Sequence, residues 1–146
     1  MVGAVSKIEE IEEGIIEEFA LFDDWMDKYE HIIGLGKELP LIEEGLKSEN
    51  LLIKGCQSKV WLHAKMEGGK VFFTADSDAI ITKGIISLLI RVLSGQTPDV
   101  IINTDLTFIE HIGLKEHLSP TRSNGLVSMV KQMKLYALAF RTQQNA

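Results

Sequence analysis

The segment from Ala79 to Leu93 constrains the fold most, because as a helix its apolar residues would cover nearly the whole circumference. A helix that is apolar on all sides is buried, either in a protein core or in a membrane. This segment carries Lys83 and Arg91 and falls short of the roughly 18 apolar residues that a membrane-spanning helix needs. We therefore expect a helix at the centre of a protein core, with N-caps from Asp76-Ser77-Asp78.

The spacing of apolar residues changes twice along the chain, from helical to strand-like and back to helical. Helices are expected over residues 7–20, 24–35, 41–46, 79–93, 98–102, 106–112 and 122–140. Strands are expected over residues 51–53, 59–65 and 70–75, with a hairpin turn at Glu67-Gly68-Gly69. This order predicts an α+β fold in a single domain, residues 1–146, with helices packed on one side of a three-stranded antiparallel sheet.

The charge balance excludes some partners. The chain has 15 Lys and Arg against 21 Asp and Glu, a formal net charge of −6. Since nucleic-acid-binding proteins neutralise phosphates with clustered Lys and Arg, this balance disfavours a nucleic-acid partner. The first residues lead into an acidic helix rather than an apolar export segment, so we expect a cytoplasmic protein that does not enter a membrane.

Cys56 is the only cysteine in the chain, which rules out an intramolecular disulfide and a structural zinc site of the usual four Cys and His ligands. It lies in the loop Gly55-Cys56-Gln57-Ser58, where we expect the thiol to be presented rather than packed. Lys54 and Lys59 flank it, and nearby cations lower the pKa of a thiol. An inert buried thiol and a reactive nucleophile both remain open.

A cysteine-dependent transferase or hydrolase would need a base near the thiol. His63 is the histidine nearest to Cys56 in sequence, so an enzyme using Cys56 and His63 is the alternative function. The four histidines show no spacing typical of a metal site, and we expect neither a metal nor a cofactor. Asp76 and Asp78 have the spacing to bind a divalent cation, but helix capping is the more common role at such a position.

Arg122 begins the last expected helix, after a turn formed by Ser119-Pro120-Thr121. An arginine at this position either holds a carboxylate in a bidentate pair or is an exposed residue of a helix cap. Both interpretations stay open on the residues alone.

Four blocks of the chain, taken together, resemble the SufE family of sulfur acceptor proteins. They are Trp25 with Tyr29, Ile32, Leu35, Gly36 and Leu39-Pro40; Gly55-Cys56-Gln57-Ser58-Lys59-Val60-Trp61; Asp76-Ser77-Asp78-Ala79 with Ile81 and Lys83-Gly84; and the segment from His117 to Leu126. The second and fourth blocks are the most specific. A close sister branch of the family, serving a second desulfurase, has the same blocks.

The resemblance implies a protein that takes sulfur from a pyridoxal-phosphate-dependent cysteine desulfurase of the SufS type, activates it, and delivers the sulfur to an iron–sulfur scaffold. It implies that Cys56 is the persulfide acceptor. It also implies that Gln57, Asp78, Glu110 and Arg122 support the site or contact the partner, and that the fold is shared with the iron–sulfur scaffold proteins. The chain would act as a monomer or homodimer and as a carrier, without enzymatic turnover of its own.

A lone cysteine suits such a carrier. A second cysteine nearby would attack the persulfide, expel sulfide and leave a disulfide, so its absence protects the cargo. We expect Leu52, Val60 and Trp61 to form an apolar pocket that shelters the loop when no partner is bound.

Overall fold

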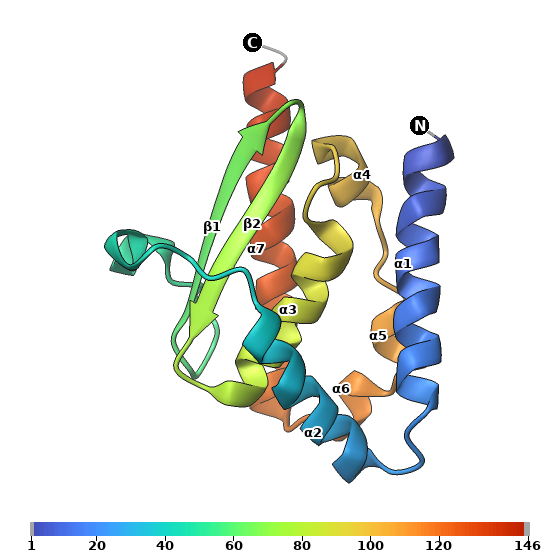
Figure 1. Ribbon diagram of the computed structural model, residues 1–146. Helices are drawn as coiled ribbons and strands as arrows, with labels where there is room; N and C mark the ends of the chain where they lie inside the picture. The colour runs from blue at the N-terminus through green and yellow to red at the C-terminus, as the bar shows by residue number, and fades with distance from the viewer. Residues whose placement is uncertain (1, 145–146) are drawn as a thin grey trace.

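The computed structural model describes residues 2–144 (Figure 1). Its elements are α1 (Val2–Ala20), α2 (Trp25–Leu35), three 3-10 turns (Gly36–Glu38, Glu44–Leu46, Glu49–Leu51), β1 (Val60–Glu67), β2 (Lys70–Ser77), α3 (Ile80–Leu93), α4 (Pro98–Asn103), α5 (Phe108–His111), α6 (Leu114–His117) and α7 (Pro120–Gln144). The α+β class predicted from the sequence is therefore confirmed.

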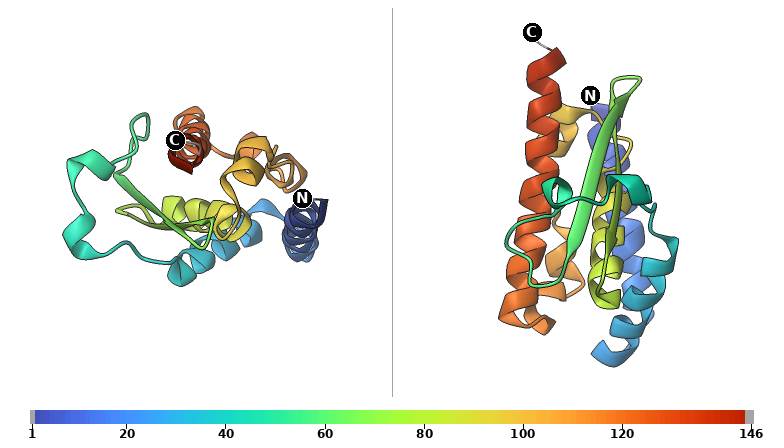
Figure 2. Two further views of the ribbon diagram at one scale, coloured as in Figure 1. Left: turned by 90° about the horizontal axis from the view of Figure 1, so that it is seen from above. Right: turned by 90° about the vertical axis from the view of Figure 1, so that its left-hand side faces the viewer.

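Helix α3 forms the centre of the core, as its apolar circumference predicts. Ten of its 14 residues are buried, and it lies between α2 and α7 (Figure 2). The N-caps expected from Asp76-Ser77-Asp78 are wrong, because no side chain caps the first helical turn. Ser77 Oγ accepts a hydrogen bond from the Ala79 N–H, just before the helix begins. Asp78 Oδ1 accepts one from the Lys59 N–H instead.

The sheet is a hairpin of two antiparallel strands, with Val60 opposite Ser77 and Glu67 opposite Lys70. Gly68 and Gly69 make the turn with φ angles of +59° and +79°, which glycine adopts without strain. Alternate residues of both strands are buried: Val60, Leu62 and Ala64 on β1, and Val71, Phe73 and Ala75 on β2. This alternation gives the sheet one buried face.

The third strand expected at residues 51–53 is not formed within the described residues. Leu51 ends a 3-10 turn, and the only pairing is a bridge between Leu52 and Trp61, where the Ile53 N–H donates to Val60 O at 2.8 Å. Gly55 follows with a φ of +92° and turns the chain away, so the pairing ends after one bridge.

The outer edge of β2 is covered by segments that are not strands. The N–H groups of Val71, Phe73 and Ala75 donate to Gln96 O, Ser94 Oγ and Pro40 O at 2.8–3.0 Å. Residues 41–46, expected to be helical, supply part of this cover, because Leu41 bridges Ala75 and only Glu44–Leu46 form a 3-10 turn. The edge therefore has its hydrogen bonds satisfied without a third strand.

Helices α2 and α3 approach each other through glycine. A Cβ added to Gly84 would lie 2.0 Å from Ile32 O, and one added to Gly36 would lie 3.0 Å from Gly84 N. This close approach fixes the spacing between the helix that carries Tyr29 and the helix that carries Thr82 and hence positions the site described next. No helix among residues 2–144 is long and apolar enough to span a membrane.

Candidate functional site

Cys56 lies in the loop before β1 and points against the start of α7. Its thiol is half-buried, and Sγ donates a hydrogen bond to Gly125 O at 3.6 Å. The side chain lines a small cavity of about 100 Å³. The other lining residues are Gln57, Ser58, Thr82, Ile85, Thr121, Arg122, Gly125 and Met129. The loop, α3 and α7 thus meet around the one thiol of the chain.

Burial raises the pKa of the Cys56 thiol. The expectation that Lys54 and Lys59 lower it is therefore wrong, as is the expectation that the thiol is presented rather than packed. The two lysines are neighbours in sequence only, whereas the environment of the sulfur is set by α3 and α7. In this conformation the protonated, hydrogen-bonded thiol is favoured at neutral pH.

The loop that carries Cys56 is held at both ends. At one end, Gly55 has a φ of +92°, and a Cβ there would lie 2.4 Å from Ser128 Oγ, so only glycine fits. At the other end, Asp78 Oδ1 accepts a hydrogen bond from the Lys59 N–H at 3.0 Å, and the Asp78 N–H donates to Lys59 O at 3.2 Å. Asp78 therefore acts on the loop rather than on the thiol.

Arg122 lies in the first turn of α7 and lines the cavity of Cys56. Its Nη1 donates a hydrogen bond to Tyr29 Oη at 3.1 Å, and its backbone N–H donates to Ser119 Oγ at 3.3 Å. Ser119 thus caps the helix, while Tyr29 of α2 holds the guanidinium beside the cavity. Gln57 lines the same cavity, so three of the residues expected at the site, Cys56, Gln57 and Arg122, come together.

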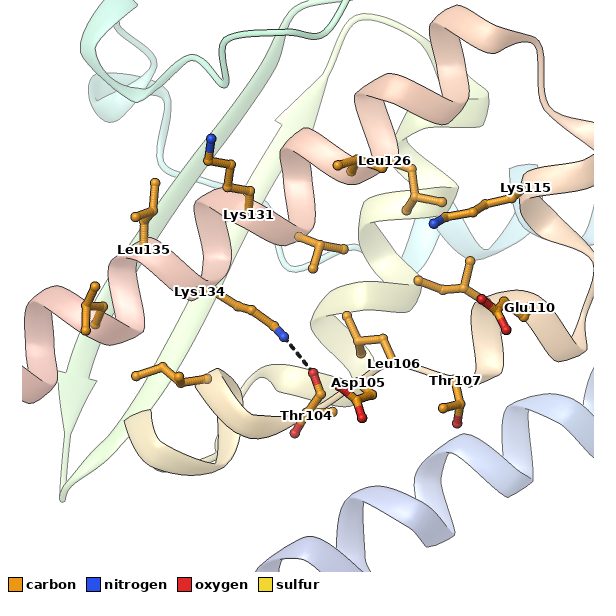
Figure 3. A pocket seen from close by; sticks show the side chains of 15 residues that line it. Thr104, Asp105, Leu106, Thr107, Glu110, Lys115, Leu126, Lys131, Lys134 and Leu135 are labelled. Atoms are coloured by element: carbon orange, nitrogen blue, oxygen red, sulfur yellow. Dashed lines mark hydrogen bonds between the residues drawn. The ribbon is translucent and has the colours of Figure 1, made fainter.

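Glu110 is not part of this cavity. It is exposed on α5 and lines a separate, larger groove along α7 (Figure 3). The structure therefore places Glu110 and Cys56 in different surface depressions.

His63 does not line the cavity either. It lies on β1 opposite Thr74, and no histidine is among the described residues that surround Cys56. The pair of Cys56 and His63 that the alternative enzyme would need is not assembled.

The apolar pocket expected from Leu52, Val60 and Trp61 is wrong, because none of the three lines the cavity. Val60 is fully buried on the inner face of the sheet, and its neighbour Trp61 points to the opposite face, since side chains alternate along a strand. Two helices, not the sheet, enclose the thiol.

Several cavity residues were missed by the sequence reasoning. Thr121, Gly125 and Met129 are spaced four apart on α7, and Thr82 and Ile85 three apart on α3, so each set shares one helix face. That spacing is a usable signal for a shared face. It does not say which other element the face meets.

Asp76 and Asp78 do not form a cation site. Asp76 makes ion pairs with Lys47 and with Lys83 Nζ, the latter at 3.3 Å. Burial acts to raise the pKa of Asp76, but the hydrogen bonds from Lys47, the Ser77 N–H and Lys83 outweigh it and lower the pKa. Within residues 2–144 no group of three or more His, Cys, Asp or Glu side chains is placed to hold a metal ion.

Comparisons with known proteins show the family of the chain. The sequence pattern of the SufE family, described as an Fe–S metabolism associated domain, matches residues 13–137. An uncharacterized SufE-like protein of Synechocystis sp. is 40% identical over 132 residues, which cover 90% of this chain and 82% of that protein. An uncharacterized SufE-like protein of Rhizobium meliloti is 39% identical over 125 residues, covering 82% and 89%.

Among solved structures, the solution structure of a hypothetical protein from Thermus thermophilus has the same fold, with a TM-score of 0.75 at 22% identity over 90% of this chain and 96% of that one. The family match spans most of the chain and includes the loop of Cys56, Asp78 and Arg122. The chain therefore belongs to the SufE family of Fe–S metabolism associated domains.

Proposed function

We propose that this protein accepts a sulfur atom as a persulfide on Cys56 from a pyridoxal-phosphate-dependent cysteine desulfurase, stimulates that enzyme by removing its product, and delivers the sulfur for iron–sulfur cluster assembly. The observation that carries the proposal is the lone thiol in a cavity beside Arg122, in a chain of a family associated with Fe–S metabolism. A reducing compartment such as the cytoplasm is the setting in which such a thiol stays free.

The transfer is a thiol exchange at sulfur. The Cys56 thiolate attacks the outer sulfur of the donor persulfide, the sulfur–sulfur bond of the donor breaks, and the donor cysteine leaves as a thiolate. One sulfur atom and its proton move from donor to acceptor, so no oxidant or reductant is consumed. The acceptor then carries Cys56–S–SH, and a second exchange of the same kind passes the outer sulfur to the recipient.

The raised pKa of Cys56 bears on the first step, because the thiolate and not the thiol is the nucleophile. The sheltered thiol donates to Gly125 O and is the resting form. Attack requires the loop to move so that Sγ leaves that carbonyl and meets the donor. In this scheme a docked desulfurase draws the loop out, and the free protein keeps the thiol unreactive.

The cavity of about 100 Å³ has room for the single sulfur atom that the carrier gains. The apolar residues Ile85 and Met129 line it together with Arg122. A persulfide is more acidic than a thiol, so a nearby cation favours its anion. Arg122 is therefore assigned to hold the charged cargo or the docked partner, and Gln57 to support the loop.

The decisive experiment is incubation of the protein with a SufS-type cysteine desulfurase and L-cysteine, followed by mass spectrometry under non-reducing conditions. One added sulfur atom on the peptide that contains Cys56, dependent on both enzyme and L-cysteine, is the expected result. The proposal would be contradicted if no persulfide formed on the protein, or if the isolated protein turned over a substrate by itself.

Cys56→Ser separates acceptance of sulfur from partner binding. It should abolish persulfide formation and the stimulation of desulfurase turnover, while the variant still binds the enzyme in a pull-down with purified components. Full stimulation by Cys56→Ser would show instead that the protein regulates the desulfurase without using its thiol.

A further inference from the structure

A second surface depression, separate from the cavity of Cys56, runs along α7. It has a volume of about 750 Å³ and lies between α7 and the segment from Ile102 to Lys115 (Figure 3). Its apolar lining residues are Ile102, Leu106, Ile109, Leu126, Val127, Val130, Leu135 and Leu138. We call this depression the α7 groove. It shares no lining residue with the cavity of Cys56.

The rim of the α7 groove exposes large apolar side chains in a row. Val127, Leu135 and Leu138 are 51%, 46% and 41% exposed. They lie on one face of α7 over eleven residues, a rise of roughly 16 Å. Exposed apolar side chains gathered in one patch, rather than scattered singly, are typical of a surface that another molecule covers.

The row on α7 is interrupted at its centre by Lys131, four residues after Val127 and four before Leu135. In a dimer whose twofold axis crosses the centre of the row, Lys131 would lie close to its own copy. Two ammonium groups would then meet inside an otherwise apolar contact. This repulsion disfavours a second copy of the chain packed row against row.

A small apolar ligand is disfavoured for a different reason. It could fill the floor, where Leu126 is buried, but would leave the exposed rim residues Val127 and Leu138 in water. A helix laid along the groove covers floor and rim together, and about eleven residues of helix match the length of the row.

The two walls of the α7 groove differ in charge. Lys131 and Lys134 lie on α7, and Lys134 Nζ donates to Thr104 O at 2.7 Å. The facing wall carries the anions Asp105 and Glu110 and one cation, Lys115 (Figure 3). Within residues 2–144 Lys131 takes part in no ion pair, and neither does Glu110. The groove thus offers an apolar floor, an unpaired cation, Lys131, on α7, and on the facing wall two anions with the single cation Lys115.

We propose that the α7 groove binds an amphipathic helix of a different protein, whose apolar face covers the row on α7 and whose flanks carry an acidic residue that pairs with Lys131 and a basic residue that pairs with Asp105 or Glu110. The bound helix would contact Leu126 and Val130, one residue along from Gly125 and Met129 of the other cavity. The thickness of α7 separates the two sites, so a partner in the groove leaves Cys56 free.

The test uses two synthetic helices of about 14 residues, stapled because unstapled helices of this length are marginal in water. Both have leucines spaced to match the row on α7 and a basic flank. They differ at one position, Glu or Lys, placed to face Lys131. Binding to the full-length protein is measured by fluorescence anisotropy, with Lys131→Glu, Leu138→Ser and, as a control, Leu21→Ser, which replaces an equally apolar exposed residue outside the groove.

The expected result is about tenfold tighter binding of the Glu peptide than of the Lys peptide to the native chain, and the reverse preference for Lys131→Glu. Leu138→Ser should weaken binding of both peptides about tenfold, and Leu21→Ser should leave it unchanged. The alkylation rate of Cys56 should not change when the peptide is bound.

Three results would overturn the proposal. One is the lack of any preference between the two peptides, whether both bind equally or neither binds saturably up to about 1 mM. Another is displacement of the bound peptide by an equimolar amount of laurate, which would indicate a site for small lipophilic anions. The third is a concentration-dependent dimer in sedimentation experiments that Leu138→Ser abolishes, which would make a second copy the occupant.

Discussion

Gly84 sets the distance between α2 and α3, and replacing it with alanine tests how tightly the site is built. A Cβ at this position would lie 2.0 Å from Ile32 O and 2.6 Å from Ile32 Cγ2, whereas Cβ atoms essentially never approach another heavy atom within 3.0 Å. Ile32 is fully buried, and the atom in the way belongs to the backbone of a helix. The two helices would therefore have to separate by about 1 Å.

Overpacking of this kind costs about 3 kcal/mol at the upper end of its usual range, while alanine in place of glycine inside a helix returns about 1 kcal/mol. The net loss for Gly84→Ala is therefore about 2 kcal/mol of unfolding free energy. For a chain of this size that corresponds to a fall of roughly 4–8 °C in the melting temperature. Because α2 carries Tyr29 and α3 carries Thr82, the separation should also change the alkylation rate of Cys56.

The assay is urea unfolding followed by circular dichroism, with the slope compared between variants so that a change of midpoint reports stability. Gly34→Ala is the matched control. Gly34 is also helical, on α2, and a Cβ there meets nothing within 4 Å, so this variant should gain about 0.5–1 kcal/mol. A Gly84→Ala chain as stable as the native one, or stabilised like Gly34→Ala, would refute the close helix contact.

Three further predictions concern the site. Because burial raises the pKa of Cys56, the folded chain holds that proton more tightly than the unfolded chain, and stability should fall as pH rises from roughly 8.5 through the folded pKa. Iodoacetamide should accordingly show a higher pH midpoint for the native protein than for the protein in urea, and a lower one would contradict the burial. Asp78→Ala should release the Lys59 N–H and speed alkylation of Cys56 several-fold, whereas Asp78→Asn keeps an acceptor and should not; equal rates for both would show that this bond does not hold the loop. Arg122→Ala loses one exposed hydrogen bond, which costs at most about 1 kcal/mol of unfolding free energy, so the variant should keep its fold. It should stimulate the desulfurase less than the native chain, and undiminished stimulation would show that Arg122 has no role in the transfer.

The sequence predicts the parts of the fold that depend on local pattern. The buried helix follows from the apolar circumference of residues 79–93, and the hairpin follows from Gly68 and Gly69 between two alternating strands. The third strand does not form, because three apolar residues make a strand only where they can pair with the edge of another strand. Gly55 turns the chain away after Ile53, so the pairing stops. Pairing of that kind is decided by tertiary geometry.

The environment of Cys56 could not be predicted from the sequence, because it too depends on tertiary geometry. Lys54 and Lys59 are two and three residues away along the chain, yet the sulfur contacts Gly125, 69 residues away, and the shift of its pKa comes from burial against α3 and α7. Charges next to a residue in sequence predict its pKa only where the side chain stays among them. Here the loop turns the thiol inward.

Hydrogen bonds at and around this cavity join the four sequence blocks that resemble the SufE family. Tyr29 of the first block binds Arg122 of the fourth, Gly125 of the fourth accepts from the thiol of the second, and Asp78 of the third anchors the loop of the second. Each of these contacts joins blocks that are 19 to 93 residues apart, so none of them stabilises a local element. One of them holds the sulfur itself, one holds the loop that carries it, and one holds the guanidinium beside it. Contacts between residues this far apart in sequence depend on the fold as a whole, so no pattern confined to a single helix or strand predicts them.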